Sequence, residues 1–245
     1  MAEKSFAVIG LGDFGLALTK ELLLLHQQVI AIDKSADQIQ RIGSDLPSAF
    51  VVDSTKGQAL KDGGVGNVDV AIISFGTNDI KDAMITTFLL TKLGVEEIIV
   101  RLDNEEHQEM LKRVGATSFI LPTRIAARSQ AIKLAGKNIA EYYAMEDHVG
   151  VSKLLVPPTF TSKKIATLNW RDEFSINIIF IQKCTNFDSE AYKANPSQFQ
   201  ARQLTFGKSV LATPDLFIDA CDNILIAGYD DDIKRFSNYL SKLKD

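Results

Sequence analysis

The sequence predicts an α/β protein in which a doubly wound parallel sheet is followed by a smaller α+β domain. In the first half of the chain, short apolar runs alternate with segments whose apolar residues recur at helical spacing. The runs are apolar throughout rather than at every second position, which is typical of parallel strands covered on both faces. A glycine-rich turn joins the first run to the first helical segment. We therefore expect a sheet with helices on both of its faces.

Six strands are expected in the first domain. The apolar runs that predict them cover residues 5–10, 28–33, 49–53, 69–76, 97–102 and 118–121. Apolar residues at helical spacing predict helices between the strands, over residues 14–25, 39–46, 79–94 and 104–115. Gly94 is a typical C-terminal glycine for the third of these helices, and Asn104 is a residue type that favours the N-cap of the fourth.

The pattern changes in the second half of the chain. We expect a first domain over residues 1–122, one or two crossover or linker helices over 123–148, and a second domain over 149–245. In the second domain the predicted strands are 149–156, 175–182 and 223–228, and the predicted helices are a short one at 162–170 and an amphipathic one at 230–243. Residues 185–208 are polar without a sustained period, so we interpret them as a loop or insertion.

Composition excludes several classes of protein. The chain has 27 Lys and Arg against 31 Asp and Glu, a net charge of −4, which argues against electrostatic binding to nucleic acid. Its two cysteines, Cys184 and Cys221, are too few for a disulfide framework or a zinc cluster. No apolar run approaches the roughly 20 residues of a membrane-spanning helix, and the first residues show no signal-peptide pattern. We therefore expect a cytoplasmic protein.

The turn after the first strand has the sequence GLGDFG, residues 10–15. Between a strand and a helix this is the fingerprint of a dinucleotide-binding, Rossmann-like domain. Gly10 permits a tight turn, Gly12 lets the backbone approach phosphate, and Gly15 allows the helix to pack closely on the strand. The helix N-terminus offers free N–H groups to an anion. The alternative interpretation is that the glycines only form a tight turn.

Asp33 ends the second strand, where a carboxylate can accept hydrogen bonds from the ribose hydroxyls of a nucleotide. The same carboxylate would repel a 2′-phosphate, which disfavours NADP. Asp53 and Ser54 follow the third strand, residues 74–76 the fourth, and Arg101 the fifth. Because ligands of open parallel sheets bind at the carboxyl ends of the strands, these residues are candidates to line a nucleotide crevice. The alternatives are that the acids and the serine only cap helices and that Arg101 only pairs with a surface carboxylate.

No group for catalysis stands beside this motif. A hydride-transfer enzyme needs an acid–base group, but His26 and His107 lie away from the carboxyl ends of the predicted strands. No tyrosine has a lysine four residues further on. The acidic residues 230–232 open the last helix, where carboxylates are favourable, so we interpret them as a cap and not as a metal site. A nucleotide site without catalytic groups predicts a sensor and not an enzyme.

Six segments of the first domain together resemble the nucleotide-binding domain of the RCK proteins, the regulators of K⁺ conductance. They are FAVIGLGDFG, VIAID, VVDST, AIISFG, IIVRLDN and VGATSFILP. In the second domain, VSKLLVPPTF, KKIATLNWRDEFSINIIFI and ACDNILIAG resemble the small RCK C-terminal domain. The likeness is greatest to the regulatory subunits of Ktr- and Trk-type potassium-uptake systems. It covers residues 5–240, except that 185–210 is longer than the expected hairpin connection.

The resemblance implies a peripheral subunit on the inner face of the cell membrane, bound to a membrane K⁺-translocating subunit of the KtrB kind. It implies homo-oligomers in which dimers form an octameric ring. It also implies that an adenine nucleotide (ATP, ADP, NAD or NADH) in the first domain controls ion flux. In several relatives the C-terminal domain binds cyclic di-AMP.

The resemblance also implies which residues contact each ligand. The positions matched to the nucleotide site are Gly10, Leu11, Gly12, Asp13, Phe14, Gly15, Asp33, Lys34, Asp53, Ser54, Ser74, Phe75, Gly76 and Arg101. The positions matched to the cyclic-dinucleotide site are Arg171, Asn177 and Ile178, although Asn169 stands where relatives often have an acid.

Two departures bear on the choice of nucleotide. The family usually has arginine where this chain has Asp13, and a glutamate associated with a divalent cation where it has Thr123. At about 4 Å and an effective dielectric constant of 20, Asp13 would repel a phosphate charge by about 4 kcal/mol before screening. We therefore hypothesise a subunit that binds ADP, NAD(H) or AMP-like ligands, or that binds ATP without the usual activating geometry.

Two other classes of protein compete with this interpretation. An NAD-dependent oxidoreductase would need the missing acid–base group and a larger substrate domain than residues 149–245. A redox-sensing transcriptional regulator would need a DNA-binding module, and no basic helix-turn-helix segment accompanies the fingerprint.

Overall fold

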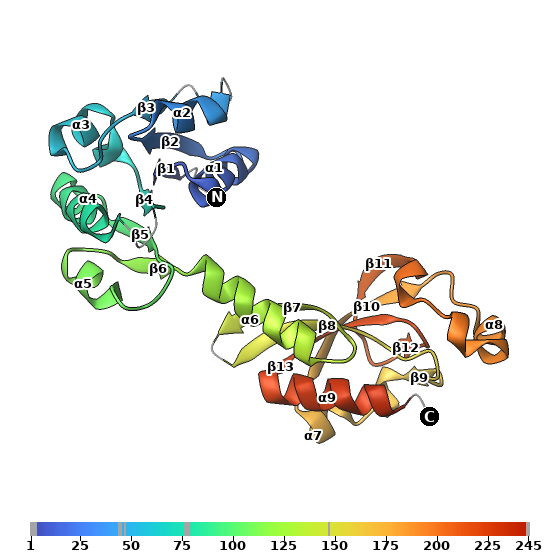
Figure 1. The fold of residues 1–245 in the computed structure, drawn as a ribbon. Helices are drawn as coiled ribbons and strands as arrows, with labels where there is room; N and C mark the ends of the chain where they lie inside the picture. The colour runs from blue at the N-terminus through green and yellow to red at the C-terminus, as the bar shows by residue number, and fades with distance from the viewer. Residues whose placement is uncertain (1–3, 44–45, 47, 76–78, 147, 244–245) are drawn as a thin grey trace. The chain divides into compact units, whose positions relative to one another are not determined.

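The computed structural model describes residues 4–43, 46, 48–75, 79–146 and 148–243 (Figure 1). The chain forms two compact units, Met1–Arg124 and Ile125–Asp245. No helix in the described part of the chain is long and apolar enough to cross a membrane.

The first unit is a six-stranded parallel sheet with the strand order β3-β2-β1-β4-β5-β6. Its strands are β1 (Ser5–Ile9), β2 (Gln28–Asp33), β3 (Ala49–Val51), β4 (Val70–Ile73), β5 (Glu97–Arg101) and β6 (Ser118–Ile120). Its helical segments are α1 (Asp13–Leu24), α2 (Ala36–Ile42), α3 (Gly57–Asp62), the 3-10 turn η2 (Val65–Asn67), α4 (Ile80–Leu93) and α5 (Gln108–Arg113). The order reverses between β1 and β4, which confirms the predicted doubly wound sheet.

Both faces of this sheet are buried, as the uninterrupted apolar strands predict. Ile9 of β1 packs with Leu90 of α4 and Leu111 of α5 on one face. Val8, its neighbour in β1, packs with Leu16 of α1 on the other face. Since successive side chains of a strand point to opposite faces, a strand covered on both sides must be apolar at every position.

The second unit is a five-stranded antiparallel sheet with the order β11-β10-β13-β8-β7, beside a two-stranded ladder of β12 and β9. Its strands are β7 (Ile139–Glu146), β8 (Val149–Leu155), β9 (Lys163–Lys164), β10 (Asn177–Cys184), β11 (Phe206–Leu211), β12 (Phe217–Ile218) and β13 (Asn223–Tyr229). The helical segments are α6 (Pro122–Ala135), which begins in the first unit, η4 (Ile165–Thr167), α7 (Trp170–Phe174), α8 (Ser189–Ala194), η5 (Pro196–Gln198), η6 (Ala201–Gln203) and α9 (Asp230–Lys242).

The core of the second unit lies between its sheet and α9. Phe236 of α9 is fully buried, and its ring meets Trp170 at 4.8 Å and Phe174 at 5.3 Å between ring centroids, both in edge-to-face geometry. Ile224 and Ile226 of β13 complete this cluster. Such aromatic pairs stabilise a core beyond the area that they bury.

Two sequence predictions for this half of the chain are wrong. The predicted helices over 123–148 end with α6 at Ala135, and residues 139–146 form strand β7 against β8. Gly136 interrupts the helix, and the aromatic and β-branched residues of 139–143 fit a pleated, half-buried surface. The predicted helix 162–170 is instead β9, the turn η4 and the start of α7.

The predicted loop 185–208 also contains more structure than expected. It holds α8, the turns η5 and η6, and the first residues of β11. Three half-buried rings support it: Phe187, Tyr192 and Phe199 contact one another at centroid distances of 5.3 to 6.1 Å. Asp188 caps α8 by accepting hydrogen bonds from two backbone N–H groups.

A cluster of charges ties β10 to the turn before β13. Lys183 Nζ donates to Asp219 Oδ2 at 2.6 Å and to Asp222 Oδ2 at 2.7 Å. Partial burial disfavours the charged forms of Lys183 and Asp219, but the combined effect of the hydrogen bonds on their pKa values is larger. These bonds raise the pKa of Lys183, and together with a bond from Ser162 they lower the pKa of Asp219.

We expect this cluster to make the stability of the second unit depend on pH. A lowered folded pKa means that the contribution of Asp219 is present above its ordinary pKa of 3.8 and is lost as the pH falls through the lower folded pKa. The contribution of Lys183 is present below 10.5 and is lost as the pH rises through its raised pKa. Asp219→Asn should therefore destabilise the chain at pH 7 more than at pH 3, measured by urea unfolding followed through Trp170 fluorescence. An equal loss at both pH values would contradict the assignment.

Candidate functional site

The glycine turn has the geometry that its sequence predicts. Gly10 has φ +93°, a left-handed conformation that side chains disfavour. A Cβ on Gly15 would lie 2.0 Å from Gly10 O and 2.3 Å from Ser74 Oγ, so no larger residue fits there without displacing backbone. A Cβ on Gly12 would have no atom within 4 Å. The turn is thus closed at Gly10 and Gly15 and open at Gly12.

Ser74 ties the end of β4 to this turn. Its hydroxyl donates to Gly10 O, and its backbone N–H donates to Ile9 O at 2.8 Å. The residue is buried. Ser74 was predicted to contact the ligand, but its hydrogen bonds instead stabilise the conformation of the glycine turn.

Asp33 holds the turn from the side of β2. Its Oδ2 accepts a hydrogen bond from the Leu11 backbone N–H at 2.6 Å, and its Oδ1 accepts one from the Ser35 N–H at 2.8 Å. Ser35 is the N-cap of α2, so the carboxylate fixes both the turn and the entry to this helix. Each carboxylate oxygen retains a lone pair, which leaves Asp33 able to accept from a ribose hydroxyl.

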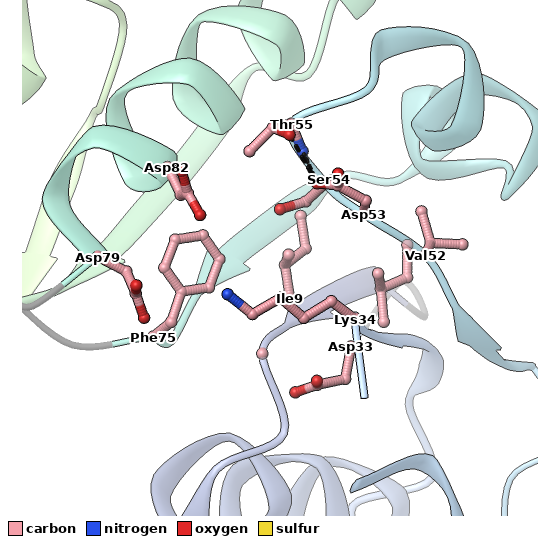
Figure 2. Close-up of a pocket in the computed structure, with 12 residues that line it drawn as sticks. Ile9, Asp33, Lys34, Val52, Asp53, Ser54, Thr55, Phe75, Asp79 and Asp82 are labelled. Atoms are coloured by element: carbon pink, nitrogen blue, oxygen red, sulfur yellow. Dashed lines mark hydrogen bonds between the residues drawn. The ribbon is translucent and has the colours of Figure 1, made fainter. Parts of the chain in front are cut away.

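A hollow opens at the carboxyl ends of the central strands (Figure 2). Its lining residues are Ile9, Gly10, Ile32, Asp33, Lys34, Val52, Asp53, Ser54, Thr55, Phe75, Asp79 and Asp82. Figure 2 shows the Lys34 side chain extending across the hollow towards the Phe75 ring. Six of the predicted residues are thereby brought to one hollow: Gly10, Asp33, Lys34, Asp53, Ser54 and Phe75.

Sequence reasoning missed two acids of this hollow, Asp79 and Asp82. They enter it at the start of α4, next to the end of β4. The sequence signal was available, because the first turn of a helix that follows a central strand faces the same edge of the sheet. Gly76, also a predicted contact, lies outside the described residues.

Asp53 and Ser54 have different roles in the wall. Asp53 Oδ1 accepts hydrogen bonds from the Thr55 hydroxyl at 2.6 Å and the Thr55 N–H at 3.0 Å. These bonds, made to the charged carboxylate, lower the pKa of Asp53. The Ser54 hydroxyl is instead paired with Thr86 of α4 at 2.9 Å, away from solvent. The Ser54 side chain therefore bonds to α4 and does not cap α3, whose N-cap is Lys56, so the alternative of a helix cap is wrong for Ser54.

Arg101 contacts the turn and not the hollow. Its guanidinium lies over the Phe14 ring at 5.7 Å from the centroid, and its Nη1 donates to Ser74 O at 3.4 Å. Its Nη2 pairs with Asp103 at 2.8 Å. Its buried Nε has no hydrogen-bond partner among the described residues. The arrangement lets Arg101 hold Phe14, and through it the start of α1, in place.

Asp13 is the first residue of α1, and its side chain is 97% exposed. Its Oδ1 lies 3.1 Å from Nη2 of Arg41, a residue of α2. The ion pair and the contact with water both weaken the repulsion expected between an unpaired Asp13 and a phosphate.

The residues matched to the cyclic-dinucleotide site lie on two elements. Arg171 is exposed on α7, whereas Asn177 and Ile178 begin β10 and pair with β13. A short connection through Ser175, with φ +55°, brings the two elements together. In the described residues no group of three or more His, Cys, Asp and Glu side chains is arranged to hold a metal ion.

The parallel sheet and its glycine turn define the class of the first unit: residues 6–122 match the TrkA-N domain. The chain is 30% identical over 181 residues to Ktr system potassium uptake protein C of Bacillus subtilis (strain 168), which covers 74% of this chain and 81% of that protein. It is 29% identical over 236 residues to Ktr system potassium uptake protein A of the same organism, 96% of each chain. The chain belongs to the family of Ktr system potassium uptake proteins.

A solved structure named "GsuK Channel" has a similar fold. Its TM-score is 0.59 at 15% identity over 95% of this chain. The chain spans about 38% of the length of that channel chain. At this identity the likeness concerns the fold alone.

Proposed function

We propose that this chain is a cytoplasmic regulatory subunit of a potassium-uptake system, whose first unit binds an adenine nucleotide: ADP, ATP or NAD(H). The observation that supports nucleotide binding is the hollow at the point where the strand order of the sheet reverses, between β1 and β4. The glycine turn borders this hollow. Family membership supports the role in potassium transport. We assign no catalytic step to the chain.

The hollow suits the uncharged part of a nucleotide. Ile9, Val52 and Phe75 offer apolar wall for a base, and Asp33 can accept from the ribose. The phosphates would leave the hollow past Gly10 towards the free N–H groups at the start of α1. The open space at Gly12 leaves room for them there.

We expect ADP or NADH to bind at least as tightly as ATP. Asp13 cannot donate a hydrogen bond to a terminal phosphate, and Thr123 supplies no carboxylate for a divalent cation. The measurement is calorimetric titration of the full chain with ATP, ADP and NADH, with and without Mg²⁺. ATP with Mg²⁺ binding much more tightly than ADP would contradict this expectation. Oxidation of NADH with a panel of substrates, followed at 340 nm, would favour the oxidoreductase alternative.

The proposed partner is a membrane K⁺-translocating subunit, which this chain would meet at the inner face of the cell membrane. We also propose, on the resemblance to RCK proteins alone, that copies of the chain form dimers that assemble into an octameric ring. In such an assembly a ligand could change ion flux only through a difference in its affinity for two states of the ring. Arg171, Asn177 and Ile178 are the proposed contacts for cyclic di-AMP. Titration with that ligand, comparing the natural chain with Arg171→Ala, tests this part.

A further inference from the structure

Arg41 reaches from the last turn of α2 to the start of α1. Its Nη2 donates to Asp13 Oδ1 at 3.1 Å, and its Nη1 donates to Gln38 Oε1 at 2.8 Å. Asp13 directly follows Gly12 of the turn. The guanidinium is therefore held beside the glycine turn by hydrogen bonds from two of its nitrogens.

Stability does not explain this arrangement. The side chain of Arg41 is 45% exposed, and that of Asp13 is 97% exposed. Exposed ion pairs contribute only about 0–1 kcal/mol, and salt weakens them further. A carboxylate in the first turn of a helix is favourable by itself and needs no arginine.

The side chains around the hollow carry more negative than positive charge, which disfavours a bound phosphate unless another cation lies close to it. The hollow is lined by four carboxylates, those of Asp33, Asp53, Asp79 and Asp82, against the single ammonium of Lys34. Arg101 pairs with Asp103 and lies over Phe14. A nucleoside diphosphate would bring further negative charge, and Asp13 would repel it. Arg41 is the cation that the structure places against Asp13.

We infer that Arg41 binds the phosphates of the nucleotide, with Asp13 and Gln38 as the residues that position it. The inference rests on the proposed function and assigns a phosphate contact from α2, outside the glycine turn. A guanidinium has five N–H donors, of which Gln38 and Asp13 each accept one. The others can form the forked hydrogen bonds that favour arginine over lysine at phosphate groups.

The test compares ADP with adenosine as calorimetric probes of Arg41→Ala. Losing charge-assisted hydrogen bonds should raise the Kd of ADP about 10- to 100-fold. The Kd of adenosine should change by less than about 2-fold, because it has no phosphate. Arg41→Lys should recover only part of the ADP affinity. Arg113→Ala is the matched control: it breaks an exposed pair with Glu109, at 3.4 Å, within α5. It should leave both ligands unaffected.

Asp13→Asn separates phosphate binding from simple neutralisation of Asp13. If Arg41 contacts phosphate, Arg41→Ala weakens ADP binding to a similar extent in the natural chain and in the Asp13→Asn variant. If Arg41 only neutralises Asp13, the loss disappears in the Asp13→Asn background, and the inference is overturned. An equal loss for adenosine and ADP also overturns it, while leaving the nucleotide site in place. A natural chain that binds neither ADP nor any other adenine nucleotide overturns the proposed function as well.

Discussion

Gly15→Ala is expected to destabilise the first unit by about 3 kcal/mol and to weaken nucleotide binding at least about 10-fold in whatever fraction still folds. The new Cβ would lie 2.0 Å from Gly10 O and 2.3 Å from Ser74 Oγ. These two atoms are hydrogen-bonded to each other, so the methyl group must push α1 away from β1 and β4. Because the first turn of α1 is the proposed phosphate site, the same movement displaces the N–H groups that would bind the ligand.

Gly12→Ala is the matched control for folding. Nothing lies within 4 Å of its added Cβ, and its φ of −60° suits alanine. Thermal unfolding should therefore be close to that of the natural chain, whereas the Kd of ADP should rise because the methyl group fills the space left for phosphate. A Gly15→Ala chain as stable as the natural one would contradict the packing described here. A Gly12→Ala chain that binds ADP unchanged would place the phosphates elsewhere.

The sequence was sufficient for the six strands of the first unit, because local and tertiary preferences agree there, but it did not predict α3 or η2 between β3 and β4. Its central strands are buried on both faces, so their uninterrupted apolar runs had one reasonable interpretation. The second unit was harder because the two preferences disagree. Residues 139–146 follow a helix and contain alanines, and only their pairing with β8 makes them a strand.

Some residues of the candidate site could be predicted from the sequence, and others could not. Gly10, Gly15 and Asp33 could be predicted because their roles depend on residues near them in a strand, turn and helix. Arg101 and Ser74 were predicted to contact the ligand, but in the structure each of them contacts the glycine turn. Arg41 could not be predicted, because its place beside Asp13 depends on how α2 packs next to α1.

Phe236→Ala is expected to destabilise the second unit by about 3–5 kcal/mol. The ring is fully buried and contacts Trp170 and Phe174 edge to face, so its removal leaves a cavity and ends both of these ring contacts. For a unit of this size the loss corresponds to a fall in melting temperature of about 10 °C or more. Phe199→Ala removes the same side chain from a half-buried ring cluster, and it should cost much less.

Because the chain forms two units, Phe236→Ala also tests whether nucleotide binding belongs to the first unit alone. Calorimetric scanning with and without ADP should show an early transition that ADP does not move and a second one that ADP shifts upward, since a ligand stabilises only the state that binds it. The single tryptophan, Trp170, assigns the early transition to the second unit by its fluorescence. A single transition whose temperature is changed by both Phe236→Ala and ADP would contradict this expectation. It would mean that the two units unfold together and that nucleotide binding in the first unit is coupled to the stability of the second.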